Sequence, residues 1–276
     1  MYRFLAFFSI SLVLFVSCRD NNSKYGYVRI QFEHHWGDSL IKIDNTTEYI
    51  NAAGNVLTFH NLEYLISDLI ISGASLVRIE QPLPVHYIND DTTNSIMLLT
   101  YQIPTGTYNN IRFTFGLSPE KNKSNLYPNL PPKMAWPGGP VSTDGVSGGG
   151  YHYMMIDGRW KDPTDTRIGF GLHLGALEQI TKIDTSYGFS QITQKVDSIT
   201  RIDTTTNKFH IQFPVSVTRS FTVEHHKITT VEPIIMDVKL WMEGRYTWDF
   251  NVMGGSIMSR RFAMDSLSRN GWNVFR

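Results

Sequence analysis

The chain has 276 residues, of which 41% are hydrophobic and 13% aromatic, so it can bury a substantial core. Its 25 basic and 25 acidic residues give a formal net charge of zero, and no run of Lys or Arg stands out. We therefore expect no nucleic-acid partner, because proteins that bind nucleic acids concentrate positive charge on one surface.

The first seventeen residues have the layout of a secretion signal. Arg3 precedes a predominantly apolar stretch from Phe4 to Val16, and the small Ser17 stands directly before Cys18. The stretch is too short for a stable membrane helix, which needs about 20 apolar residues. We therefore predict that residues 1–17 are a signal peptide removed on export.

Cys18 is the only cysteine of the chain, so no disulfide can form within it. The segment from Phe15 to Cys18 resembles the lipobox of bacterial lipoproteins, with Phe where Leu is usual. Lipidation would consume the thiol, whereas the alternative is an ordinary signal followed by an incidental cysteine. We expect lipid attachment at Cys18, a polar tether over residues 18–24, and a place in the cell envelope at the outer membrane.

Residues 25–276 are predicted to form one all-β domain, an antiparallel β-sandwich or barrel-like structure with a short C-terminal helix. The prediction rests on alternating or β-branched runs that recur along the chain. Extended segments are expected at Tyr25–Phe32, Ser39–Ile43, Asn55–Phe59, Leu62–Ile79, Ile96–Tyr101, Asn110–Gly116, Tyr151–Gly158, Arg167–Leu174, His210–Val217 and Ile234–Leu240.

Two stretches interrupt this pattern. Pro128 to Gly150 is rich in Pro and Gly, which predicts a long loop, and loops of that length are often functional. Residues 180–207 are rich in Thr, Ser, Asp and Ile, which predicts an inserted hairpin arm. Within the arm, the sequence at 180–186 is loosely repeated at 199–205, and a true small repeat is the alternative interpretation.

A single helix is expected near the C-terminus. Ser256 is the predicted cap, and Asn270-Gly271 are the predicted stop. The apolar stripe that would face the core consists of Ile257, Phe262, Met264 and Leu267.

The sequence lacks the familiar signatures of enzymes. It has no phosphate-binding Gly-rich loop with Lys, no nucleophile elbow and no His-Glu-x-x-His pair. We therefore expect a protein that is not an enzyme.

Several histidines stand next to tryptophan, tyrosine or glycine. They are His34 and His35 before Trp36, His152 between two tyrosines, and His173 within Gly-Leu-His-Leu-Gly. Neutral imidazole binds copper and zinc well, although a structural role is the alternative for each histidine. Trp136 lies in a Pro/Gly-rich segment, where it could equally anchor the loop to the core.

An ordered series of segments resembles one family, the copper-binding MbnP-like domain. The resemblance covers nearly the whole chain after the tether. The matching segments are Val28–Leu40, Tyr49–Gly54, Leu62–Asp68, Ile111–Leu117 followed by Asn122, Met134–Trp136, Gly150–Gly158 and Phe170–Gly175, with the C-terminal helix.

The resemblance implies copper binding outside the cytoplasm by histidines. In some members it also implies a tryptophan oxidised to kynurenine by a di-haem peroxidase-like partner. His173 occupies the family's F-x-x-H-x-G motif, His152 adjoins a matched tyrosine, and His34 and His35 lie on a matched turn. Trp136 matches a family tryptophan and is the candidate for a modified or site-lining aromatic.

Three features depart from the family pattern: an insertion at Pro137 to Gly149, Met155 in place of the usual Lys, and the extra residues 180–207. We therefore keep two hypotheses. The first is a lipid-anchored envelope protein that binds copper through histidines. The second is a surface-recognition or scaffold lipoprotein that binds glycan or protein and whose histidines are structural.

Overall fold

The computed structural model describes residues 25–73, 76–79, 85–90, 95–136, 138–142, 145–180, 184–190, 195–201, 206–209, 211–258 and 260–276. The predicted signal peptide, Cys18 and the tether lie outside the described residues. Within the described part, no helix has both the length and the apolar character needed to cross a bilayer.

Strands dominate the described chain. They are β1 (Tyr25–Trp36), β2 (Ser39–Leu40), β3 (Tyr49–Ile50), β4 (Val56–Gly73), β5 (Leu76–Ile79), β6 (Val85–Asn89), β7 (Ile96–Pro104), β8 (Gly106–Phe115), β9 (Gly138–Ser142), β10 (Gly145–Lys161), β11 (Arg167–Ile180), β12 (Asp184–Ser190), β13 (Lys195–Arg201), β14 (Thr206–Phe209), β15 (Phe213–Val223), β16 (Ile228–Thr230) and β17 (Ile234–Asp237). The helices are the 3₁₀ turn η1 (Pro132–Met134), α1 (Leu240–Glu243), α2 (Phe250–Met253) and α3 (Arg261–Gly271).

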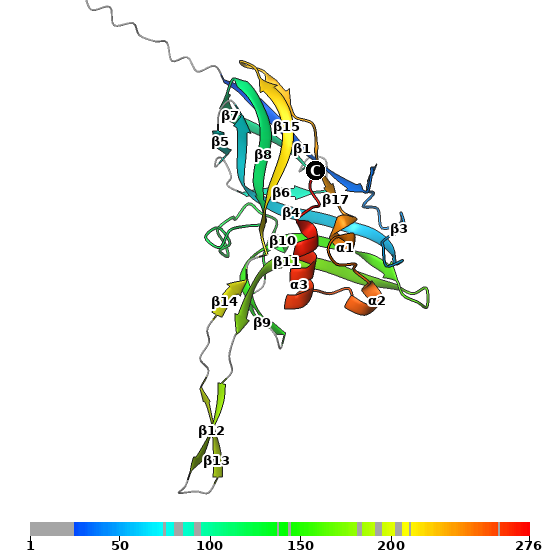
Figure 1. The fold of residues 1–276 in the computed structure, drawn as a ribbon, viewed down its shortest axis with the longest axis vertical. Coiled ribbons are helices and arrows are strands. Elements are labelled where there is room, and N and C mark those ends of the chain that lie inside the picture. Colours follow the sequence, from blue (N-terminus) through cyan, green and yellow to red (C-terminus); the bar gives the residue numbers. More distant parts are fainter. Residues whose placement is uncertain are drawn as a thin grey trace, which may run out of the picture.

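Two sheets form the body (Figure 1). The larger has the order β14-β11-β10-β4-β8-β15, with β3, β5 and β6 also paired to β4 and β9 to β10. In the smaller sheet β1 is central, antiparallel to β2 and β7 and parallel to β16 and β17. The predicted all-β sandwich with a C-terminal helix is confirmed.

The alternation along β1 shows how the sequence fills the space between the sheets. Val28, Ile30, Phe32 and His34 point inward and are buried, while the residues between them are more exposed. Phe32 packs edge to face against Tyr64 of β4 and Phe113 of β8, which belong to the larger sheet. Apolar burial at every second residue therefore joins the two sheets into one core.

β4 is longer than the sequence suggested. The segments expected at Asn55–Phe59 and Leu62–Ile79 are mostly one strand, because Asp157 of β10 pairs with Asn61 while Gly158 pairs with Phe59. His60 is therefore an extra residue in the strand, and this bulge lets the strand continue.

The prediction of one long loop from Pro128 to Gly150 is partly wrong. Gly138–Ser142 forms β9, and β10 already begins at Gly145, so the glycine-rich stretch pairs with its own neighbour as an antiparallel hairpin. Glycine weakens a strand but does not prevent backbone pairing when a partner lies alongside.

The C-terminal helix is present, but two details of its prediction are wrong. Ser256 is not its cap, because this residue forms a parallel bridge with Gly171 and α3 begins only at Arg261. Phe262 is 70% exposed, while Met264 and Leu267 are fully buried. The core-facing stripe therefore leaves Phe262 in solvent.

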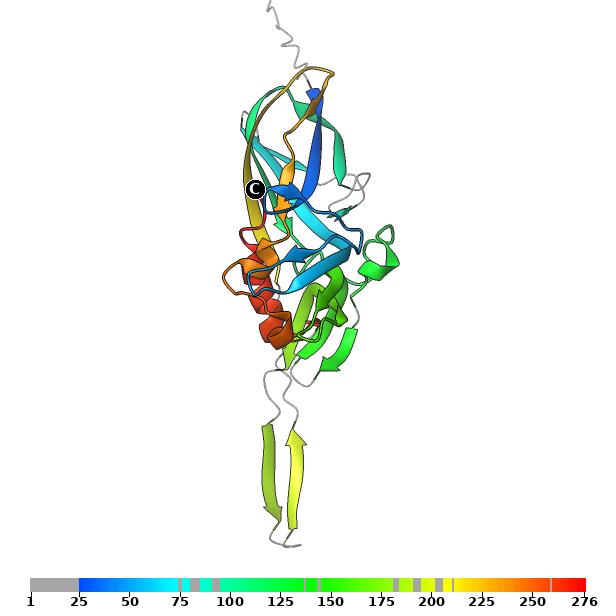
Figure 2. The same ribbon diagram turned by 90° about the vertical axis from the view of Figure 1, so that its right-hand side faces the viewer.

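β12 and β13 pair only with each other, in the segment where the sequence predicts a hairpin arm. Figures 1 and 2 show the pair projecting away from the sandwich beyond the ends of β11 and β14. β14 returns to pair with β11. The arm therefore leaves and rejoins the body at one edge of the larger sheet.

Candidate metal site

Three adjacent strands of the larger sheet build the candidate site. Met155 of β10 stands opposite Glu63 of β4 on one side and His173 of β11 on the other. Directly paired residues in a sheet point to the same face, so these three side chains share one face. Tyr64 and Leu174 follow Glu63 and His173 in sequence and point to the opposite face, into the core.

A one-residue bulge in β10 brings His152 onto the same face. Met154 pairs with Leu174, but His152 pairs with Gly175, so Tyr153 is an extra residue between the two pairs. If β10 paired regularly with β11 here, Tyr153 would stand opposite Gly175 and His152 would point toward the core instead. The bulge therefore places the His152 and His173 rings together, with centroids 5.2 Å apart at an interplanar angle of 89°.

Trp136 packs over this face beside His152. The ring centroids lie 4.7 Å apart in an edge-to-face arrangement, and the indole is only 2% exposed. Gly175 provides the space for the indole, because a Cβ there would lie 2.5 Å from Cδ2 of Trp136. A backbone bond from the Trp136 N–H to the Gly150 carbonyl (2.9 Å) fixes the segment that carries the indole.

Trp136 also lines a pocket of about 230 Å³ that it shares with Tyr127, Leu130 and Tyr151. The pocket lies where the segment after β8 packs against the start of β10. The indole therefore borders both the histidine pair and a cavity lined by two tyrosines, three prolines and Leu130 among other residues.

His173 is held by a carboxylate. Its Nε2 lies 2.7 Å from Oδ1 of Asp157, and Oδ2 of the same carboxylate accepts a bond from Nδ2 of Asn61 at 2.8 Å. Burial raises the pKa of the Asp157 carboxyl. The hydrogen bond from His173, the positive charge of the His173 ring when it is protonated, and the hydrogen bond from Asn61 outweigh burial and leave that pKa below its usual value. An ionised Asp157 favours the proton on Nε2 and leaves the lone pair of Nδ1 free.

Glu63 extends this network into the protein. The residue has no exposed surface, and Oε1 accepts a bond from the same Asn61 amide at 2.9 Å. Oε2 accepts from the Tyr87 hydroxyl and lies 2.9 Å from Nζ of Lys133. Burial and this hydrogen bond to Glu63 both raise the pKa of Tyr87, so the hydroxyl keeps its proton. The buried carboxylate is therefore fully surrounded by donors.

His152 differs from His173 in having no carboxylate partner. It is 5% exposed, and neither ring nitrogen has a hydrogen bond of good geometry to any described residue. Burial and then the neighbouring His173 lower its pKa to about 4, and a weak hydrogen bond with the Met134 backbone opposes that shift. His152 is thus neutral at pH 7 and offers unused lone-pair and N–H groups, a costly arrangement for a buried side chain without a ligand.

His34 and His35 do not lie with this pair. Nε2 of His34 is 3.2 Å from the Tyr64 hydroxyl, on the core face of the larger sheet, and burial, then His35, lower its pKa to about 4. Nε2 of His35 lies 3.1 Å from Oε2 of Glu33 on its own strand, and its Nδ1 is buried without a hydrogen bond. The structure thus brings together His152, His173 and Trp136, and separates them from the β1 pair.

The described residues contain no group of three or more His, Cys, Asp or Glu side chains arranged to hold a metal ion. The site therefore offers two imidazoles, one of them positioned by a carboxylate, with the Met155 thioether on the same face. Thioether and imidazole together suit copper, and especially Cu(I), better than they suit magnesium or calcium.

Four residues of this site were missed by the sequence reasoning: Asn61, Glu63, Met155 and Asp157. A signal existed for Glu63, because a carboxylate inside the apolar run Leu62 to Ile66 is unusual. The other three become visible only once the register of β4, β10 and β11 is known.

The class of protein follows from comparison with known families. The family model described as MbnP matches residues 25–258, so the chain belongs to the MbnP family. The solved structure of MbnP from Methylosinus trichosporium is similar, with 13% sequence identity over 82% of this chain and 79% of that one and a TM-score of 0.48. A comparison with curated proteins gives no match.

Proposed function

We propose that this protein binds copper, with His152 and His173 as the nitrogen ligands. The observation that carries the proposal is the buried ring of His152, whose two nitrogens have no hydrogen bond of good geometry to the described residues, packed against the carboxylate-bonded His173. A bound cation would satisfy the unpaired lone pair of His152. It would also use Nδ1 of His173 while Asp157 holds the other nitrogen, as in many metal sites.

Met155 is proposed as the third member of the donor set. It is paired directly with His173 and Glu63 on the neighbouring strands, and it lies between His152 and Asp157 along β10. The resemblance places Lys at this position in the family, so this chain exchanges an amine for a thioether. A thioether favours Cu(I), which would give the protein a preference for the reduced ion.

The proposal keeps the envelope location and the lipid anchor at Cys18, a residue outside the described chain. In this setting the protein would act as a binding protein rather than an enzyme, beside a di-haem peroxidase-like partner of the kind that the resemblance implies. Trp136 is then the aromatic side chain that borders the copper-binding residues.

The test is a Cu(I) competition titration of the soluble form lacking residues 1–24. We expect one ion per chain and at least about a 100-fold loss of affinity in both H152A and H173A. The double variant H225A/H226A is the matched control, because it removes an exposed histidine pair whose rings lie 4.0 Å apart. Wild-type affinity in H152A and H173A, or loss of affinity in the control alone, would refute the proposal.

A further inference from the structure

A second candidate site lies between α3 and the residues directly before β15, and it shares no residue with the histidine site. Eight residues line a pocket of about 560 Å³, a volume within the usual range for small-molecule sites. Six of them carry hydrogen-bonding side chains, Trp272 is aromatic, and Ile211 is the single aliphatic one. The pocket is thus polar and has one large ring at its edge.

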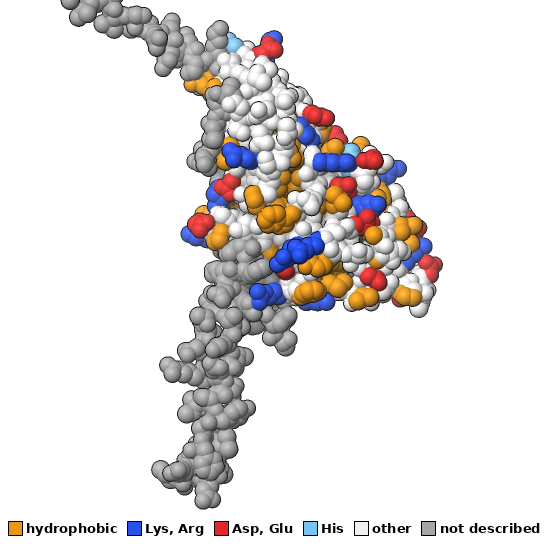
Figure 3. Space-filling view, viewed as in Figure 1, with side chains coloured by type: hydrophobic (Ala, Val, Ile, Leu, Met, Phe, Trp, Pro, Cys, Tyr) orange, Lys and Arg blue, Asp and Glu red, His pale blue; other side chains and the backbone are white. Residues whose placement is uncertain are grey.

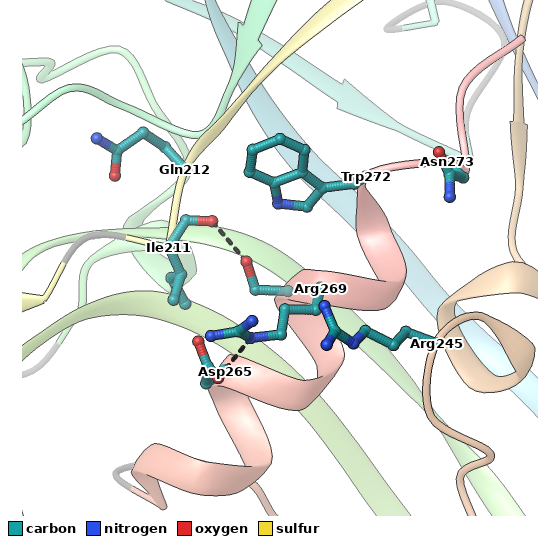
Figure 4. Close-up of a pocket in the computed structure, with 8 residues that line it drawn as sticks. Ile211, Gln212, Arg245, Asp265, Arg269, Trp272 and Asn273 are labelled. Atoms are coloured by element: carbon teal, nitrogen blue, oxygen red, sulfur yellow. Dashed lines mark hydrogen bonds and ion pairs between the residues drawn. The ribbon is translucent and has the colours of Figure 1, made fainter.

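Trp272 provides a fixed flat surface. Its indole is 61% exposed, yet it stacks on Phe213 with centroids 6.0 Å apart and an interplanar angle of 26°. Figure 4 shows the indole on one side of the pocket, with the guanidinium groups of Arg245 and Arg269 below it. A ring packed from behind and exposed in front offers a stacking face without losing further side-chain freedom.

The charge around the pocket is positive. Arg269 pairs with Asp265 through Nε and Oδ2 at 2.7 Å, whereas Arg245 has no ion pair with any residue in the described ranges. Its guanidinium lies 5.8 Å from the centre of the Tyr246 ring. The space-filling view shows basic side chains beside hydrophobic ones over α3 (Figure 3). One positive charge is therefore available for an anionic ligand.

The walls of the pocket are tied to α3 before any ligand arrives. Nδ2 of Asn270 donates to the Trp241 and Tyr246 carbonyls (2.9 and 2.8 Å), and its Oδ1 accepts from the Tyr246 N–H at 2.8 Å. On the other side, the Ser268 hydroxyl donates to the Ile211 carbonyl at 3.0 Å. The loop with Arg245 and the strand with Ile211 are thus held in place, as a preformed site requires.

We propose that this pocket binds a carboxylated saccharide, with a sugar ring stacked on Trp272 and its carboxylate paired with Arg245. The C–H face of a pyranose packs on an indole, and the planar polar groups of Asp265 and Asn273 match pairs of sugar hydroxyls. An acidic peptide fits less well, because the pocket has a single aliphatic lining residue with which to hold an apolar anchor. The proposal is independent of copper.

The test uses a tetrasaccharide alternating glucuronate with N-acetylglucosamine, with chitotetraose as its neutral counterpart. Of the six tryptophans, Trp272 is the one that the structure shows as a largely exposed side chain, so acrylamide quenching reports chiefly on it. We expect the acidic saccharide, and not the neutral one, to protect this fluorescence in a saturable way.

Calorimetry on variants then assigns the site. W272A and R245Q should each weaken binding at least about tenfold, whereas F262A, which removes another exposed aromatic of α3 outside the pocket, should leave it unchanged. Equal binding of both saccharides, no binding at millimolar concentration, wild-type affinity in W272A and R245Q, or equally tight binding of tetraglutamate would overturn the proposal.

Discussion

The molecule carries two pairs of histidines, His34 with His35 on β1 and His152 with His173 on the larger sheet, and they differ in what their neighbours supply. His34 bonds to the Tyr64 hydroxyl and His35 to Glu33, so each has a protein partner. In the other pair His173 has Asp157, but neither nitrogen of His152 has a hydrogen bond of good geometry within the described chain. Each ring of the β1 pair thus has a side-chain partner, whereas the pair assembled across two strands contains one ring without any.

The largest expected effect concerns the structural pair. The pKa of His34 is about 4 in the folded protein and 6.5 when unperturbed, because of burial first and the charge of His35 second. Between these values the unfolded chain binds the extra proton, so stability present above pH 6.5 is lost as the pH falls through 4. The complete loss is about 3 kcal/mol for this residue.

Urea unfolding at pH 7, 5.5 and 4 measures this effect. H34Q should have a shallower dependence on pH than the wild type, with the remaining slope due to His86 and His152, whose pKa values are also about 4. H225Q, an exposed control, should keep the full slope. An unchanged slope in H34Q would show that His34 is not buried as a neutral ring.

The next effect tests the packing of Trp136 on Gly175, beside His152 and His173. G175A places a methyl group 2.5 Å from the Trp136 ring and should cost about 2 kcal/mol of stability, with a shift in tryptophan emission. G169A on the same strand is the control, because its nearest atom, the Gly158 carbonyl oxygen, would lie 4.0 Å away. Similar unfolding midpoints for the two variants would contradict the packing of Trp136 on Gly175.

A smaller effect is expected from the carboxylate that distinguishes His173 from His152. D157N removes the charge that orients His173 and should weaken copper binding about tenfold. D165N changes an exposed carboxylate in the turn after β10 and should leave the affinity unaltered. Equal copper affinity in D157N and D165N would contradict a role for Asp157 in orienting His173.

The smallest effect concerns metal preference. M155L keeps the volume but removes the sulfur, so Cu(I) affinity should fall about fivefold, or about 1 kcal/mol, while zinc affinity stays the same. Competition titrations with both ions measure the difference. A parallel loss for copper and zinc would mean that Met155 shapes the site without acting as a donor.

The sequence predicted the sandwich well because alternation is a local property. The buried positions of β1 can be read directly from every second residue, and the family pattern confirmed by comparison follows the same strands. The sequence also predicts the C-terminal helix, but it misplaces the cap at Ser256. That error arose because pairing with Gly171, a contact distant in sequence, keeps Ser256 extended.

The site was only half visible in the sequence, for a physical reason. His152, His173 and Trp136 could be nominated by residue type, but so could His34 and His35. What separates them is the pairing of β4, β10 and β11, which decides that Asp157 reaches His173 and that Glu63 faces Met155. Register depends on contacts far apart in the chain, and composition or spacing does not encode it.

The extra residue at Tyr153 has a consequence for how such a site can change over generations. Deleting Tyr153 would leave His152 opposite Gly175 on the sheet surface, because the residue before Met154 pairs with Gly175 in a regular strand. The bulge can thus absorb a change of one residue in chain length without moving either imidazole to the other face. Relatives of either length should therefore be aligned on the His173 to Gly175 motif, because counting residues from Gly150 can pair a surface position with a core one.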